Sequence, residues 1–295
     1  MLLGVNNRIN DAAITFSGNT FEANFPVANL KDYRLQKTAR TEAVTDTTLI
    51  FTFSSPTDNM GCVVLANHNL SRRAIVKIYW GTGDINTDLN SGSISPWFYR
   101  HGSDPYYLVN TFTKNIFPSD IDKANTNKDN TLVYFLPVEK KVDVVTVVIS
   151  DDLNADGYFE IGRGFIGNQL EFRESYGGYS PSNEDLSDID TTPSGIQYAW
   201  QRKKLRTLSA NGNYQTVGVG FAVLNAHHNG GLTGDVVVAQ ALPVYETITI
   251  SAVDRLVVDS NWFSQAFLGR FTALDPMSRS LEFHYGSTLS IKEVA

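Results

Sequence analysis

The segment DDLNADG comes nearest to a known chemical motif. Asp152, Asn154 and Asp156 alternate as oxygen ligands do in the first half of a calcium-binding loop. A complete EF-hand loop needs a bidentate glutamate at its twelfth position, and Arg163 stands there instead. We therefore expect these residues to form a tight turn between two strands, centred on Asp156 and Gly157. A weak calcium site near 152–156, outside the EF-hand scheme, stays open as the alternative.

The histidines do not have the spacing of a metal site. His227 and His228 are adjacent, so on a helix their side chains would point about 100° apart and could not share one metal with i, i+4 geometry. They are interpreted as the end of a helix, where they favour its dipole. His68 lies between two asparagines in an expected turn, where a hydrogen bond to the backbone is favoured over catalysis.

Motifs of the common enzyme classes are missing from the sequence. It contains no G-x-S-x-G, no H-E-x-x-H and no Walker-type glycine loop. GRGFIG, at 162–167, is rich in glycine but lies in a predicted strand. A carboxylate pair for glycoside hydrolysis is defined in space, and the sequence nominates none. We therefore predict no enzyme activity, no catalytic residue, no cofactor and no metal.

Four aromatic residues are candidates for contact with a glycan or a neighbouring subunit. Trp97, Tyr99, Tyr106 and Tyr107 lie in residues 81–130, the least regular part of the chain. Long irregular loops are often functional, and exposed aromatic residues are typical contact residues. The simpler interpretation, which we favour, is that they cover one mouth of a β-sandwich.

A short basic stretch is the other candidate. Arg202, Lys203 and Lys204, followed by Arg206, stand together in a chain whose formal net charge is −7. The stretch is too small to indicate nucleic acid on an acidic protein. It fits a contact with an acidic neighbouring subunit, or simply a solvated strand end.

Length and composition limit the remaining classes of protein. The 295 residues suffice for two domains, with 42% hydrophobic and 12% aromatic residues favouring a strand-rich core. A single cysteine, Cys62, excludes an internal disulfide and is expected to be a buried, inert thiol. No apolar run is long enough to span a membrane, and the first residues lack the hydrophobic core of a signal peptide.

The elements that would position these residues are strands. Residues 62–66 are nearly all apolar, which is typical of a strand covered on both faces, and a polar turn leads to a second strand over 74–80. This pair indicates the middle of a β-sandwich. Residues 46–53 predict another strand, followed by a polar turn over 54–59.

The predicted fold class is mainly all-β. Residues 1–170 are expected to form a jelly-roll-like β-sandwich. Residues 171–199 are expected to be a linker or arm, because they carry glycines, a proline and a run of acids. Residues 200–295 are expected to form a β-barrel or sandwich with one helix, over 214–228.

Several segments together resemble a known family. FPVANLKDYRLQKTART, VVLANHNLSRRAIVKIYWG and DGYFEIGRGFIG resemble the galactose-binding-like sandwich of tail proteins from long-tailed bacteriophages. RKKLRTLSANGNY, GLTGDVVVAQ, FLGRFTALDPMS and STLSIKEV resemble the C-terminal domain of the same proteins. The order of these pieces covers most of the chain.

The resemblance implies a structural virion protein of the phage tail tip, similar to a distal tail protein. Such a protein would be a homo-oligomer, forming a ring, commonly hexameric, that joins the tail tube to baseplate or tail-fibre proteins. It would be assembled in the host bacterial cytoplasm. The alternative is a carbohydrate-binding module that recognises a host-surface glycan, because aromatic-rich loops suit sugar faces. A glycan-cleaving enzyme ranks last.

Overall fold

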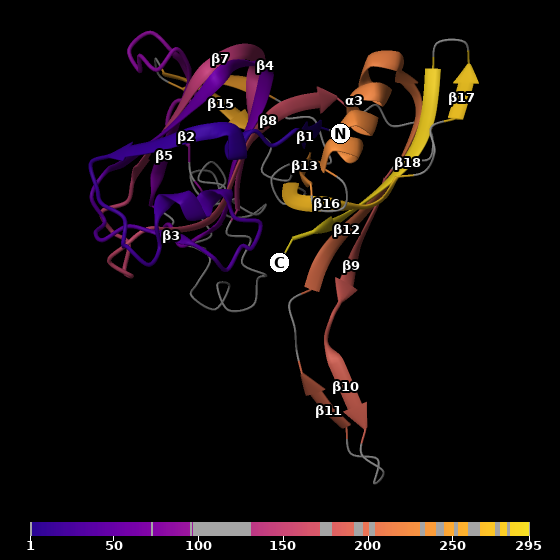
Figure 1. The fold of residues 1–295 in the computed structure, drawn as a ribbon, viewed down its shortest axis with the longest axis horizontal. Helices are drawn as coiled ribbons and strands as arrows, with labels where there is room; N and C mark the ends of the chain where they lie inside the picture. The colour runs from indigo at the N-terminus through magenta and orange to yellow at the C-terminus, as the bar shows by residue number, and fades with distance from the viewer. Residues whose placement is uncertain are drawn as a thin grey trace. The chain divides into compact units, whose positions relative to one another are not determined.

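The computed structural model describes residues 2–71, 73–94, 96, 131–171, 179–191, 197–200, 204–230, 234–239, 245–250, 253–258, 266–274, 278–281 and 284–294. The chain forms two compact units. The first comprises Met1–Ile116, Asp129–Glu171 and Asp235–Leu268, and the second comprises Phe117–Lys128, Phe172–Gly234 and Gly269–Ala295. Within the described residues, strands dominate and the single α-helix is α3 (Val217–Gly230) (Figure 1). The prediction of a mainly all-β protein with one helix is confirmed.

The longest strands of the first unit are β4 (Thr47–His68), β7 (Thr131–Ser150) and β8 (Glu160–Glu171). Strands β4 and β7 pair with each other along two separate stretches. Residues 47–52 of β4 pair with 144–149 of β7, and residues 62–66 of β4 pair with 131–135 of β7. Register shifts between residues 52 and 62 separate the two parts, as β-bulges do where a strand changes direction.

The two parts of these strands belong to two layers. The first part of β4 and the last part of β7 pair with β2 (Ala12–Ser17) and β5 (Ile75–Gly81), and β6 (Leu89–Asn90) extends this layer. The last part of β4 pairs with β8, which also pairs with β3 (Ala39–Arg40) and β1 (Leu2–Val5). Another hairpin of this unit consists of β14 (Tyr245–Ile250) and β15 (Val253–Val258).

One hydrophobic core joins these two layers. Phe51 and Trp80 from the first layer lie in the same buried cluster as Val63 and Leu65 from the second. Trp80 also packs on Tyr134, with ring centroids 6.3 Å apart. A shared core between two antiparallel layers is the arrangement of a β-sandwich, as predicted for this part of the chain.

The predicted central strands lie on either side of a third strand. Residues 62–66 of β4 are buried throughout, which confirms a strand covered on both faces. The strand predicted over 46–53 is confirmed as the first part of β4, but the polar turn predicted over 54–59 is wrong, because β4 continues through it. Pro56, which has no N–H to donate, falls in the bulged region, where a strand tolerates proline. Strand β7 lies between β4 and β5.

Strand β1 lies between β8 and β13 (Asp235–Ala239), although β13 comes from the last third of the chain. Leu3 is paired with Leu170 on one side and with Val238 on the other. At Gly4 the backbone is closely approached, since a Cβ there would make tight contacts of 3.0 Å with both Cys62 Sγ and Val237 Cβ. Residues 235–268 therefore count with the first unit.

The second unit is built on an antiparallel sheet. Its strand order is β16 (Ala266–Leu274), β18 (His284–Glu293), β12 (Lys204–Thr216) and β9 (Tyr179–Asp185), with β17 (Ser278–Leu281) also pairing with β18. Arg206 of β12 donates to both carboxylate oxygens of Glu293 at 2.9–3.1 Å. The helix predicted over 214–228 is confirmed by α3, whose His227 ring meets the Phe271 ring edge-on at 5.6 Å.

A separate two-stranded ribbon completes the described elements of the second unit. It consists of β10 (Asp188–Thr191) and β11 (Gln197–Trp200), which pair only with each other among the described strands. Figure 1 shows the two strands as a hairpin. Strands β9 and β10 and most of β11 thus lie within residues 171–199, the stretch that the sequence predicted as a linker or arm.

Candidate functional site

A buried arginine lies at the centre of a polar network in the first unit. Arg163 stands in the middle of β8 in the segment GRGFIG and is 1% exposed. Its Nε donates to Asp235 Oδ2 at 2.9 Å, and its Nη2 lies 2.7 Å from the same oxygen. Asp235, at the start of β13, is equally buried, so the two charges form an ion pair shielded from water.

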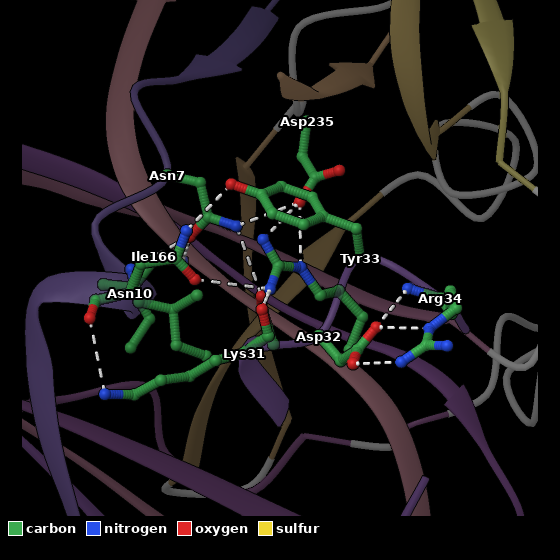
Figure 2. Close-up of polar contacts among 11 residues, drawn as sticks. Asn7, Asn10, Lys31, Asp32, Tyr33, Arg34, Ile166 and Asp235 are labelled. Carbon is green, nitrogen blue, oxygen red and sulfur yellow. Dashed lines mark hydrogen bonds and ion pairs between the residues drawn. The ribbon is translucent and has the colours of Figure 1, made fainter. Parts of the chain in front are cut away.

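Residues near the N-terminus enclose this ion pair. Asn7 Nδ2 donates to Asp235 Oδ2 at 3.2 Å, while Asn7 Oδ1 accepts from Ile166 N at 3.2 Å. Arg163 Nη1 donates to the carbonyl of Lys31, and its guanidinium carbon lies 4.6 Å from the centroid of the Tyr33 ring. Figure 2 shows Asn7, Lys31, Tyr33 and Asp235 gathered around this point. The network joins four segments of the chain and acts as a structural tie.

The surface next to this tie carries a charged cluster on the loop after η2 (Val27–Lys31). Arg34 donates from Nε and Nη2 to the two carboxylate oxygens of Asp32 at 3.0 and 2.9 Å (Figure 2). Lys37 Nζ adds a bond of 3.0 Å to Asp32 Oδ2. The hydrogen bonds from Arg34, then that from Lys37, hold the pKa of Asp32 well below its usual range. The two cations are exposed and both are engaged with the one Asp32 carboxylate, so we assign the group no chemistry.

A second polar group of the sandwich is partly open to solvent. The Arg40 guanidinium carbon lies 4.2 Å from the Phe25 ring centroid and 4.4 Å from the Tyr158 ring centroid. Its Nη2 donates to Glu160 Oε2 at 3.2 Å, and Glu160 Oε1 accepts from Thr38 Oγ1 at 2.6 Å. Arg40 Nε is buried and has no hydrogen-bond partner among the described residues, which is unusual for a buried donor. We call Phe25, Arg40, Tyr158 and Glu160 the Arg40 cluster.

The predicted turn around Asp156 and Gly157 is confirmed, with Gly157 at φ +78°. Its side chains are bound to the turn that follows β4. Asn69 Nδ2 donates to Asp156 Oδ2 at 3.0 Å, and the buried Asp151 accepts from Ser71 N at 2.6 Å. Among the described residues, no group of three or more His, Cys, Asp or Glu side chains is placed to hold a metal ion. These hydrogen bonds tie two loops of the sandwich together.

His68 is buried, and the predicted hydrogen bond of its ring to the backbone is confirmed. Its Nε2 lies 3.2 Å from the Pro96 carbonyl. Burial lowers the pKa of His68 to about 4, against a smaller opposite effect of the Pro96 carbonyl. Cys62 is also buried, as predicted, and burial raises the pKa of its thiol well above the usual value.

The ribbon carries two aromatic side chains that are more than half exposed, the most exposed aromatics of the second unit among the described residues. Tyr198 is 53% exposed and Trp200 is 58% exposed. The register pairs Asp190 with Tyr198, and Trp200 follows two residues later along β11. Side chains two residues apart on a strand share a face, so these three project from one side of the ribbon. We call Asp190, Tyr198 and Trp200 the ribbon face.

Most contact residues predicted from the sequence lie outside the described residues. This holds for Trp97, Tyr99, Tyr106 and Tyr107, and for Arg202 and Lys203. Lys204 is the first residue of β12. Sequence reasoning missed the Arg40 cluster and the ribbon face. Tyr198 and Trp200 stand two apart in QYAW, an alternation that could have predicted an amphipathic strand.

The described residues contain no helix long and apolar enough to cross a membrane. No family model and no curated protein matches the chain.

Several solved structures resemble the chain. A fucose-binding module from Streptococcus pneumoniae has 10% identity and a TM-score of 0.36, over 56% of this chain and 96% of that one. A serum fucolectin from striped bass, Morone saxatilis, has 9% identity and a TM-score of 0.36, over 72% and 71%. A GH31 CBM32 module bound to GalNAc has 13% identity and a TM-score of 0.31, over 53% and 98%. TM-scores below 0.5 transfer no function to this chain.

The buried ion pair yields a stability prediction. Asp235→Ala leaves the Arg163 guanidinium buried without its counter-charge, so we expect it to cost about 3–5 kcal/mol in the free energy of unfolding. Urea unfolding of the full chain measures this. The matched control is Asp11→Ala, which removes an exposed pair with Arg8 at 2.7 Å and should cost no more than about 1 kcal/mol. Equal losses in the two variants would contradict a stabilising role for the buried pair.

His68 yields a prediction of pH dependence. The folded state keeps the ring neutral down to pH of about 4, whereas the unfolded state binds a proton below pH 6.5. The stability that depends on a neutral ring is therefore complete above pH 6.5 and falls as the pH drops towards 4, by about 3 kcal/mol at most. Unfolding free energies of the wild type and His68→Gln should differ in slope over this range. Parallel profiles would refute the assignment.

Proposed function

We propose that this protein is a non-catalytic structural subunit of a bacteriophage tail tip, and that it assembles into the virion through its second unit. The observation that carries the proposal is the ribbon of β10 and β11. The family resemblance of the sequence, from residues 25–41 through to 287–294, supports the same role.

The ribbon has two physical features that contact with another protein would compensate. An isolated two-stranded hairpin is at best marginally stable in water, and among the described residues no third strand pairs with β10 or β11. Tyr198 and Trp200 are more than half exposed, although aromatic rings of this size gain most from burial in an interface. A ribbon of this kind is suited to contact with a neighbouring protein.

A ring of identical copies would supply such a neighbour. Closed cyclic assemblies use head-to-tail contacts, in which two different surfaces of the chain meet at each interface. Edge strand β9 contains Pro181, which is typical of an edge protected against indiscriminate pairing with other strands. The ribbon would therefore make the specific contacts, with the tail tube and the baseplate or fibre proteins as further partners.

The assembly role predicts that the protein is a component of the particle. Mass spectrometry of purified virions should find the full chain, and electron microscopy with an antibody label should place it at the tail tip in a ring. An antibody against a capsid protein is the control for the label. Absence from purified particles would overturn the proposal, whatever the behaviour of the isolated chain.

A second candidate function is binding of a carbohydrate by the sandwich, as the sequence analysis also suggested. The Arg40 cluster favours it. Arg40 and Glu160 have side chains that are 24% and 23% exposed, and Arg40 Nε is a buried donor that lacks a partner among the described residues. Arginine, carboxylate and aromatic groups side by side can bind the hydroxyl groups and apolar face of a sugar.

The glycan candidate predicts a specific loss of binding. An array of bacterial surface glycans should reveal a ligand for the wild type, and Arg40→Lys should weaken it at least about tenfold, because lysine lacks the planar fork of donors. Arg8→Lys, at an exposed arginine of the same unit, should bind like the wild type. Trp97→Ala tests the aromatic loop in the same assay. If the wild type binds no glycan on the array, this candidate function is wrong.

A further inference from the structure

Strand β2 forms one edge of the first layer of the sandwich. It pairs with β4 along its whole length without a bulge, and among the described strands no other pairs with it. The Ala12 carbonyl at its start accepts a hydrogen bond from Lys31 Nζ at 2.6 Å. The backbone of residues 13–17 has no hydrogen-bond partner outside β4 in the described part of the chain. Because alternate residues of an edge strand turn their N–H and C=O groups away from the neighbouring strand, a row of these groups lies open here.

The sequence of β2 does not protect this edge. Proteins usually blunt an edge strand with a proline, a charged side chain, a bulge or a very short length. The sequence AAITFS has no proline and no charge, and its register is regular. The opposite edge of the same layer differs, because β6 has only two residues and residues 91 and 94 make only isolated backbone bonds to β5. Strand β2 is therefore suited to accept a further strand.

The two faces of β2 define the side chains that such a strand would carry. On one face Ala12 is buried, Ile14 packs against the hydrophobic core, and Phe16 is 40% exposed. The Phe16 ring is held edge-on against Phe21, with centroids 4.9 Å apart. The other face is exposed and carries small, uncharged residues: Ala13, Thr15 and Ser17. An added strand with apolar side chains on the first face would extend the core over Ile14 and Phe16, while its second face stayed polar.

A second copy of the chain is a poorer match for this edge. Pairing of β2 with β2 of another copy uses the same strand on both sides, so it closes as a dimer and cannot supply the head-to-tail contacts of a ring. We infer that the edge of β2 binds an extended, uncharged segment of a different protein, in which apolar residues alternate with small polar ones. The inference rests on the proposed function only where it sets self-pairing aside.

A synthetic peptide tests the inference on the full chain. The probe has about eight residues, is blocked at both ends, and alternates valine with threonine. It should slow amide exchange over residues 13–17 at least about fivefold, measured by hydrogen–deuterium exchange. A control peptide with two adjacent prolines at its centre cannot form a regular ladder on either side and should protect nothing. Because no charge takes part, probe affinity should change less than about twofold between about 50 and 500 mM NaCl.

Two substitutions locate the contact. Phe16→Lys removes the ring that the probe would cover and places a charge on the edge, so it should raise the dissociation constant of the labelled probe at least about tenfold. Ile75→Lys is the matched control, because Ile75 is 46% exposed on β5 in the same layer and is not part of the β2 edge. This variant should bind like the wild type. Unchanged circular dichroism spectra would show that both variants are folded.

The inference is overturned if the wild type does not bind the probe at concentrations up to about 1 mM, if the proline peptide binds equally well, or if protection falls outside residues 13–17. Protection of these residues that rises with protein concentration, without any probe, would identify a second copy as the occupant and would overturn it too. None of these results bears on the presence of the chain in virions. A chain that is found at the tail tip but does not bind the probe keeps the proposed function, whereas one that binds the probe but is missing from virions keeps the β2 site alone.

Discussion

The buried ion pair between Arg163 and Asp235 is the constraint on which the first unit depends. A guanidinium that is 1% exposed is tolerable only with a counter-charge and full hydrogen bonding, so β8 requires β13 to be in place. Asp235 lies 72 residues after Arg163, and the residues between belong largely to the second unit. The chain therefore leaves the sandwich after β8 and must return to it before the sandwich is complete. Such long-range contacts slow folding. The first unit is complete only when β13 joins it, after the intervening residues of the second unit.

The polar side chains of the sandwich described above mostly make hydrogen bonds that hold its loops and strands together. Asp151 holds the turn after β4, Asn7 holds Ile166 and Asp235, and the Asp32 carboxylate is shared by two cations. His68 is neutral at pH 7 because its pKa is about 4, and burial keeps Cys62 a thiol. General acid–base or nucleophilic catalysis needs such groups poised and accessible to a substrate. In this structure these groups are instead engaged in holding the fold together.

The sequence predicted the parts of the fold that follow from local patterns. The apolar run over 62–66 arises from residues adjacent on the chain, so its signal is strong. The signal for α3 was weaker, because Gly218 and Gly220 lower its helix propensity. Pro56 and its polar neighbours carried a turn signal that tertiary pairing overrode, because β4 absorbs them as bulges between two layers. The ion pair between Arg163 and Asp235 could not be predicted from a local sequence pattern, because the two residues are far apart in the sequence. The Arg40 cluster was missed for the same reason, since Phe25, Arg40 and Tyr158 come from separate segments.

The sandwich and the ribbon differ in how fully their own contacts satisfy their side chains. In the sandwich, hydrogen bonds join the turn at 67–71 to the turn at 151–158, so the polar groups of these two loops are satisfied within the unit. In the ribbon, two strands pair with each other alone among the described strands, and their largest side chains face outwards. A hairpin with such a surface loses conformational entropy on ordering without the burial that normally compensates for it. The exposure of Tyr198 and Trp200 on a two-stranded ribbon is the observation on which the proposed assembly role rests.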